Sequence, residues 1–389
     1  MLQKQKLLYG VIAVLAVAVA VVGVASWSNN DSSMNSMMGM SDKQRREMMR
    51  DYMGTADERG VAQKTAADRQ PLAASEENGF KVFKLNAQPI RWQYKNGKTI
   101  MAWGYNGQVP GPEIRVRQGD KVRVVFTNNL PKATSLHWHG LDVPNNMDGV
   151  PGLTQNAIQP GQTFTYEFTA VPAGTRFYHT HGSGQDDEAE QMDMGLSGAF
   201  IVEPADYQKP DKEFTVLLDD WQSMGGNMNT AMMGGMGMSA MGSMNYGLFT
   251  LNGLAFPDTE SLNVQQGNKV RVRFINASSS TTHPMHLHGH QAKVVAIDGN
   301  ELAASQQYLR NTITLNPGET YDIEFTANNP GNWLLHCHEL HHAGSGMATI
   351  LKYEGYRAPA GLTPAGGNDQ NEDEEMDGMG MGDMGNMRH

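Results

Sequence analysis

Twelve of the chain's 13 histidines fall in four short motifs, and eight of them form pairs separated by one residue. The pairs are His137 and His139 in HWHG, His179 and His181 in HTHG, His286 and His288 in HPMHLHGH, and His336 and His338 in HCHELHHAGSGM. Side chains two residues apart on a strand point to the same face, so each pair presents two imidazoles together. Imidazole is a common metal ligand. Four such pairs predict metal centres rather than unrelated surface histidines.

A second group of residues combines softer ligands. Cys337 is the only cysteine of the chain, His342 and Met347 follow it closely, and His283 opens the third motif. One thiolate, two imidazoles and a weak thioether form the ligand set of a blue-copper electron-transfer site. Zinc also binds sites of cysteine and histidine, but the thioether favours copper. A single cysteine excludes an intramolecular disulfide framework and any cysteine-rich zinc or iron–sulfur site.

The elements that must position these residues are indicated by an internal repeat. RQGDKVRVVFTN, from Arg117, matches QQGNKVRVRFIN, from Gln265, and PGQTFTYEFTA, from Pro160, matches PGETYDIEFTA, from Pro317. The second alignment carries His179 onto His336, Thr180 onto Cys337 and His181 onto His338. Short alternating runs between NN, PG and DG turns are typical of antiparallel strands in a sandwich. The sequence therefore predicts an all-β chain of two related β-sandwiches.

Composition shifts divide the chain further. We expect sandwich domains over residues 80–205 and 206–356, a flexible linker over 29–79, a Met-rich insert over 224–244, and a disordered acidic Met-rich tail over 357–389. Residues 1–28 carry two lysines before an apolar run from Leu7 to Ala25, which predicts either a cleaved signal peptide or an uncleaved membrane anchor. Either segment places the rest outside the cytoplasm, in the periplasm or on the outer face of the cytoplasmic membrane. The net charge of −11 argues against a nucleic-acid partner.

Together, the four motifs resemble those of the multicopper oxidases, the laccase-like enzymes, in their two-domain form, over about residues 85–355. The resemblance implies two cupredoxin-like Greek-key sandwiches and four coppers per functional unit: one type 1, one type 2 and two type 3. It assigns His137 and His286 to the type 2 copper. It assigns His139, His179 and His338 to one type 3 ion, and His181, His288 and His336 to the other. The type 1 ligands would be His283, Cys337, His342 and an axial Met347. His290, His341 and His389 have no family role, and we expect them at the surface.

The resemblance also implies how such a protein works. Cys337 lies between two type 3 ligands, so a one-electron site is joined covalently to a cluster that reduces dioxygen to water. Asp148 in HWHGLDVPNNMDG matches the family's acidic residue near the cluster and is assigned as a proton relay, although a turn carboxylate is the alternative. Ala343 stands where bacterial members often carry a second acid, and Glu339, Asp186, Asp187 or Glu188 could substitute for that acid.

Relatives of this length place the cluster between domain 1 of one subunit and domain 2 of the next, in a homotrimer. An intramolecular cluster remains an alternative. Copper nitrite reductases share the trimer but carry the type 1 copper in domain 1, where this chain has Thr180 instead of cysteine.

Thirteen of the chain's 27 methionines lie in two segments without amphipathic periodicity. They are Met224, Met228, Met232, Met233, Met236, Met238, Met241 and Met244 in the insert, and Met376, Met379, Met381, Met384 and Met387 in the tail. Thioethers select Cu(I), so we expect an oxidase that prefers Cu(I) and accepts phenols or aromatic amines. The alternatives are a laccase with an organic physiological substrate, a copper-sequestering protein without relevant turnover, and, for these segments, low-complexity filler.

Overall fold

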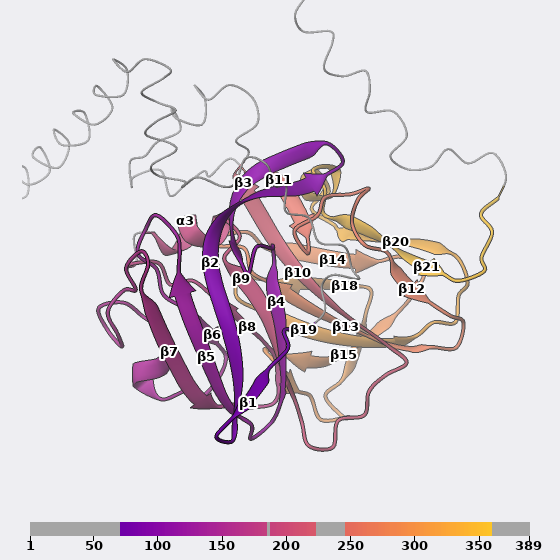
Figure 1. Cartoon of the computed structure of the whole chain (residues 1–389). Helices are drawn as coiled ribbons and strands as arrows, with labels where there is room; N and C mark the ends of the chain where they lie inside the picture. The colour runs from indigo at the N-terminus through magenta and orange to yellow at the C-terminus, as the bar shows by residue number, and fades with distance from the viewer. Residues whose placement is uncertain (1–70, 185–186, 223–245, 360–389) are drawn as a thin grey trace, which may run out of the picture.

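The computed structural model describes residues 71–184, 187–222 and 246–359, which form two β-sandwiches side by side (Figure 1). The expected export segment, most of the linker, the Met-rich insert and nearly all of the tail lie outside these described residues. Within the described part, no helix is long and apolar enough to cross a membrane. The prediction of an all-β fold is confirmed, because only short helical turns interrupt the strands over residues 71–184, 187–222 and 246–359.

The first sandwich contains the strands before residue 204. They are β1 (Ser75–Glu77), β2 (Phe80–Lys95), β3 (Lys98–Tyr105), β4 (Gly111–Arg117), β5 (Lys121–Asn128), β6 (His137–His139), β7 (Thr163–Thr169), β8 (Gly174–His179) and β9 (Ser197–Glu203). One sheet has the order β1-β2-β5-β7 with β3 on β2, and the other has the order β4-β9-β8-β6. The helices are the 3-10 turn η1 (Asn145–Met147) and α3 (Glu188–Asp193). Because β1 pairs with β2, the end of the expected linker belongs to the first sheet.

The second sandwich contains the remaining strands. They are β10 (Lys212–Gln222), β11 (Tyr246–Leu251), β12 (Leu262–Val264), β13 (Lys269–Asn276), β14 (His283–Leu287), β15 (Ala292–Ile297), β16 (Asn300–Glu301), β17 (Tyr308–Arg310), β18 (Thr312–Leu315), β19 (Thr320–Thr326), β20 (Asn332–Cys337) and β21 (Ala348–Tyr353). One sheet has the order β11-β10-β13-β19-β15-β16 with β17 on β15, and the other has the order β12-β21-β20-β14-β18. The short helix α5 (Leu340–Gly344) follows β20.

The two copies of the repeated strand show how the domains pack. β5 alternates between buried apolar and half-exposed polar side chains, as a strand with one solvated face should. Its repeat partner β13 is buried on both faces after its first residue. Arg271 and Arg273 of β13 are therefore 6% and 3% exposed. Arg273 donates to the Thr175 hydroxyl of the first domain at 2.7 Å, so this strand lies at the domain interface.

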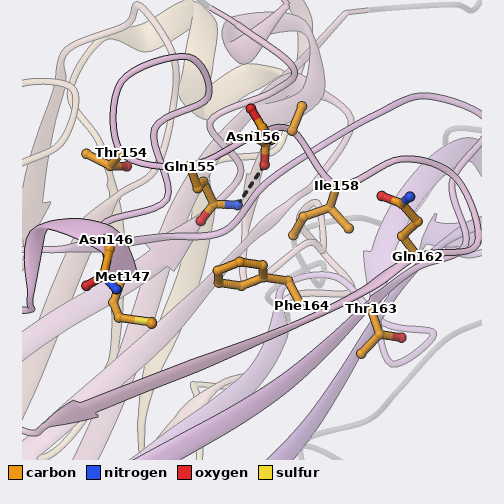
Figure 2. Close-up of a pocket in the computed structure, with 10 residues that line it drawn as sticks. Asn146, Met147, Thr154, Gln155, Asn156, Ile158, Gln162, Thr163 and Phe164 are labelled. Carbon is orange, nitrogen blue, oxygen red and sulfur yellow. Dashed lines mark hydrogen bonds between the residues drawn. The ribbon is translucent and has the colours of Figure 1, made fainter.

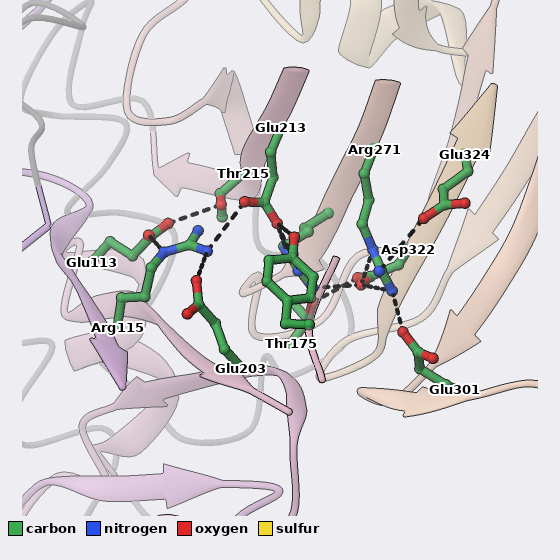
Figure 3. Close-up of polar contacts among 12 residues, drawn as sticks. Glu113, Arg115, Thr175, Glu203, Glu213, Thr215, Arg271, Glu301, Asp322 and Glu324 are labelled. Atoms are coloured by element: carbon green, nitrogen blue, oxygen red, sulfur yellow. Dashed lines mark hydrogen bonds and ion pairs between the residues drawn. The ribbon is translucent and has the colours of Figure 1, made fainter. Parts of the chain in front are cut away.

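Apolar and charged contacts both join the domains. Phe177 and Ile201 of the first domain share one buried cluster with Leu217 and Ile275 of the second. Beside it runs a continuous set of ion pairs (Figure 3). Asp322 accepts hydrogen bonds from Arg273 at 2.6 Å and from the Thr175 hydroxyl of the first domain at 2.6 Å. Buried charges are costly unless they are paired in this way, so the network holds one relative placement of the two domains.

Candidate metal centres

The first set of histidines lies on β6 and the end of β8. These strands are antiparallel and place His137 opposite His179. His137 is the centre of the set: its ring centroid lies 5.8 Å from that of His139, 5.2 Å from His179 and 5.6 Å from His181. The HWHG and HTHG motifs thus meet, as the alternation of strand side chains predicts, and four imidazoles gather at one end of the first sandwich.

The second set repeats this arrangement on β14 and β20. His286 lies opposite His336 across the two antiparallel strands. The ring centroid of His286 lies 4.7 Å from that of His288, 5.7 Å from His336 and 5.6 Å from His338. The two predicted type 2 ligands, His137 and His286, are therefore the central members of their sets.

Backbone carbonyls orient the imidazoles in both sets. Nδ1 of His137 contacts the carbonyl oxygen of Asp148 at 2.7 Å, and Nδ1 of His286 contacts that of Asn311 at 2.8 Å. Nδ1 of His179 and of His336 contact the carbonyl of the next residue at 2.6 and 2.8 Å. A carbonyl only accepts, so Nδ1 carries the proton and Nε2 keeps its lone pair. This is how proteins prepare histidines for a metal.

Ring nitrogens also face each other within each set. Nδ1 of His139 lies 3.3 Å from Nε2 of His179, and Nε2 of His288 lies 3.1 Å from Nε2 of His336. Burial, and after it the neighbouring His137, lowers the pKa of His139 to about 4. Burial is also the main cause that lowers the pKa of His179 and of His336. Neutral imidazoles with converging lone pairs fit metal ions.

The cysteine site lies in the core of the second sandwich. Sγ of Cys337 lies 3.8 Å from Nδ1 of His283 and 3.6 Å from Nδ1 of His342. Cys337 and Met347 are fully buried in the same apolar cluster, and the backbone N–H of Cys337 donates to the carbonyl of Met347 at 3.0 Å. Phe249 stacks on the His342 ring at a centroid distance of 4.0 Å. The ligand atoms of His283, Cys337 and His342 all lie within 4.8 Å of one another, so they could hold one ion.

The equivalent place in the first sandwich is occupied by groups that do not bind copper. Thr134 precedes His137 by three residues, as His283 precedes His286. Its hydroxyl lies 2.9 Å from that of Thr180, which stands in the cysteine position. The N–H of Thr180 donates to Leu196, as that of Cys337 donates to Met347. Thr134 thus stands in the position of His283, Thr180 in that of Cys337 and Leu196 in that of Met347, and all three are buried.

The candidate acids lie in different places. The carboxylate of Asp148 lies 3.4 Å from Nδ1 of His137, at the first histidine set. The carboxylate of Glu188, at the start of α3, lies 3.0 Å from Nδ1 of His181. Asp187 instead accepts hydrogen bonds from Ser183. Glu339 pairs with His342 at the cysteine site, at 3.2 Å, and Asp186 is outside the described residues.

The sequence motifs did not predict two of the contacts made by their histidines. Asp220, at the end of β10, lies 2.9 Å from Nε2 of His283. His290, expected at the surface, is buried, because its Nε2 contacts the Tyr353 hydroxyl at 2.6 Å and its ring stacks on that side chain. His341 is exposed as predicted, and His389 lies outside the described residues.

An open pocket lies on the first sandwich, beyond the histidines. Met147, Gln155, Ile158 and Phe164 are among its lining residues (Figure 2). No predicted copper ligand lines it, although η1 at its edge directly precedes Asp148. It is therefore separate from the candidate metal centres.

Comparisons with known proteins agree with this geometry. Multicopper oxidase family models match residues 86–206 and 227–355. The chain is 34% identical to a probable nitrite reductase–hydroxylamine oxidoreductase fusion protein of Kuenenia stuttgartiensis, over 70% of this chain and 31% of that protein. It is 30% identical to copper resistance protein A of Escherichia coli, over 75% of this chain and 52% of that protein. The chain thus spans about a third of one relative and half of the other.

Among solved structures, the blue copper oxidase from Nitrosomonas europaea superimposes with a TM-score of 0.63 and 33% sequence identity, over 70% of this chain and 86% of that chain. The matched regions contain both histidine sets and the cysteine site, whose donors suit copper. The chain belongs to the multicopper oxidase family, whose centres hold copper.

Proposed function

We propose that this protein is an oxidase that couples one-electron oxidation of a substrate to the four-electron reduction of dioxygen to water. The observation that carries the proposal is the position of Cys337 on β20. Its neighbours His336 and His338 belong to the second histidine set, while its own side chain faces His283 and His342. One strand therefore joins a single-electron site to a multi-histidine cluster through covalent bonds, which a storage protein would not need.

In this proposal, His283, Cys337, His342 and Met347 hold the type 1 copper, and the two histidine sets hold the type 2 and type 3 ions. Bound copper supplies the one-electron couple at the first site and the reduction of dioxygen at the second. The protein supplies ligand geometry: carbonyl acceptors keep Nε2 of His137, His179, His286 and His336 available. Thr180 argues against a nitrite reductase arrangement, because the first domain has no thiolate to offer.

We also propose that the cluster forms between subunits of a homotrimer. In the part of the chain that the structure describes, ring contacts join the imidazoles within each set, and none joins the two sets. Exposed apolar side chains lie close in the sequence to residues that contact each set. Leu153, 79% exposed, follows the loop that contacts His137, and Leu309, 64% exposed, precedes the Asn311 carbonyl that contacts His286. A closed ring of subunits would cover both faces at once.

Proton supply is assigned to carboxylates beside the histidines. Asp148 would relay protons at His137, as its 3.4 Å contact supports. Of the candidates for the second acid, Glu188 is supported best, because it lies beside His181 rather than beside the cysteine site. Burial is the largest cause that raises its pKa, which favours an acid that can hold a proton.

Cu(I) is the proposed physiological substrate, with phenols or aromatic amines also accepted. The methionines of the insert support this substrate. The insert connects the end of β10, at residue 222, to the start of β11, at residue 246. β11 carries Phe249, which stacks on His342 of the proposed type 1 site. The relative named copper resistance protein A is consistent with such a role. The apolar run from Leu7 to Ala25 supports export to the periplasm.

The test is oxygen consumption by the copper-loaded protein with Cu(I) or a small phenol as the reductant. Deleting residues 224–244 should lower turnover on limiting Cu(I) and leave phenol turnover nearly unchanged, because a phenol has no affinity for thioethers. Loss of neither activity would favour an organic physiological substrate. No oxygen consumption with either reductant would favour copper sequestration.

A further inference from the structure

Three buried carboxylates lie behind the cysteine site, at the contact between the domains. Asp219 and Asp220 are consecutive residues of β10 in the second domain, and Asp193 ends α3 in the first. They are 0%, 0% and 6% exposed. None of them is a proposed copper ligand. We call these three residues the acid cluster.

The acid cluster touches the cysteine site through Asp220. Oδ1 of Asp220 lies 2.9 Å from Nε2 of His283, and both side chains are fully buried. The opposite ring nitrogen, Nδ1, faces Sγ of Cys337 at 3.8 Å. Apart from His283, no hydrogen-bond donor among the described residues reaches either oxygen of Asp220. His283 is therefore held between a thiol on one side and a carboxylate on the other.

The other two carboxyls favour their neutral forms. Burial raises the pKa of Asp219 well above its usual range, and the nearby Asp220 raises it further. Burial likewise raises the pKa of Asp193 to about 7, although the hydroxyls of Ser279 and Tyr246 oppose that shift. Three buried carboxylates cannot all ionise close together. Asp220 differs from the other two in its surroundings, because its carboxyl group faces the imidazole of His283 at 2.9 Å.

We propose that Asp220 is the positioning residue of the type 1 site: it orients His283 with Nδ1 toward Cys337 and makes the imidazole a stronger donor. A carboxylate that accepts the second N–H of a metal-binding histidine fixes its tautomer and raises its basicity. A negative charge behind the ligand also favours Cu(II) over Cu(I). Asp220 thus lowers the reduction potential of the site. This inference rests on the proposed copper site of His283, Cys337, His342 and Met347.

The experiment is a redox titration of the copper-loaded protein, followed through the visible absorption of the thiolate–Cu(II) pair. Asp220→Asn should stay blue and shift the Cu(II)/Cu(I) equilibrium toward Cu(I) by about tenfold, which is 59 mV for a one-electron couple. Asp219→Asn is the matched control: it is the adjacent buried carboxyl of the same strand, it does not face His283, and its equilibrium should change less than about twofold. An equilibrium unchanged in Asp220→Asn would overturn the inference.

A second variant covers the case in which Asp220→Asn fails to bind copper. Asp220→Glu keeps a carboxylate and should restore the blue colour, whereas a folded, colourless Asp220→Glu protein would overturn the inference. The wild-type protein separates this test from the proposed function. A copper-loaded wild type that is never blue would contradict the proposed type 1 site. A blue wild type whose reduction potential does not change in Asp220→Asn would contradict only the role of Asp220.

Discussion

Thr180 and Cys337 occupy equivalent positions of the two sandwiches, and each accepts on its backbone oxygen a contact from Nδ1 of the preceding histidine, at 2.6 and 2.8 Å. The backbone framework is therefore the same in both halves of the chain, and only the side chain differs. The hydroxyl of Thr180 contacts Thr134 and Gln191, whereas the thiol of Cys337 faces two imidazoles. One fold thus supports a histidine set in each domain and a thiolate site in only one.

Replacing the thiol tests this difference directly. Cys337→Ser should abolish the blue colour and lower substrate oxidation by at least about a hundredfold, because the colour requires a thiolate on copper and the chain has only one. Copper bound by the histidine sets should remain, as measured by metal analysis and electron paramagnetic resonance. Thr180→Ser keeps the hydroxyl and is the control. A blue Cys337→Ser protein would contradict the assignment.

A cluster shared between subunits predicts that a charge introduced at the subunit interface separates the subunits. Leu309→Glu should dissociate the trimer, because an unpaired carboxylate would be buried at the interface. The dissociated protein should stay blue and lose oxygen reduction. Light scattering with absorption and oxygen-electrode measurements would show both effects. Tyr356→Ser, which changes another exposed large side chain, should leave the trimer intact, and an active monomer would favour an intramolecular cluster.

The proposed proton relay through Asp148 predicts that its removal slows one half-reaction and not the other. Asp148→Asn should slow oxygen reduction by about a hundredfold, the usual contribution of a positioned acid, and leave anaerobic reduction of the blue site by substrate unchanged. Stopped-flow absorption separates the two half-reactions. Asp142→Asn, an exposed carboxylate of the same loop, is the matched control. Equal rates in Asp148→Asn and wild type would assign Asp148 to the turn alone.

The pKa of Asp193 predicts a pH-dependent stability. Burial raises this pKa to about 7 in the folded protein, whereas an unfolded Asp has a value of about 3.9. The folded state therefore binds more protons between these values, and stability falls as the pH rises through that window. Asp193→Asn removes this cost and still accepts from Tyr246. Asp193→Asn should therefore have a larger free energy of unfolding than the wild type, and this difference should be about 2 kcal/mol larger at pH 8 than at pH 5.

Urea denaturation of the metal-free proteins at the two pH values would measure the gain. Asp206→Asn, an exposed carboxylate, should show no such growth. A gain that is equal at pH 5 and pH 8 would contradict the raised pKa of Asp193.

The sequence predicted the parts of the site that depend on local periodicity. The paired histidines share faces because strand side chains alternate, and the repeat places His179 and His336 at equivalent positions. The fold class followed from the same alternating runs. The sequence also predicted that the first domain carries no type 1 site, because Thr180 aligns with Cys337.

Contacts between distant segments could not be predicted in this way. Asp220 lies on β10 in one sheet of the second sandwich, and His283 begins β14 in the other sheet, so their contact depends on how the two sheets pack. His290 is buried through Tyr353, which is 63 residues later. Arg271 and Arg273 occupy strand positions that are partly solvated in the repeat but are buried here. Arg273 contacts Thr175 of the first domain, and Arg271 is paired with carboxylates of its own domain. Each depends on how sheets pack, which a single strand pattern does not encode.

The stoichiometry of oxygen reduction tests the central claim most directly. An oxygen electrode, a spectrophotometric count of oxidised one-electron substrate and a peroxide assay would be applied to the same copper-loaded sample. A site at Cys337 that feeds a complete histidine cluster predicts four substrate molecules oxidised for each dioxygen consumed, with no hydrogen peroxide released. Two substrate molecules per dioxygen with an equal amount of peroxide would contradict the account, because the histidine sets would then not act as one cluster.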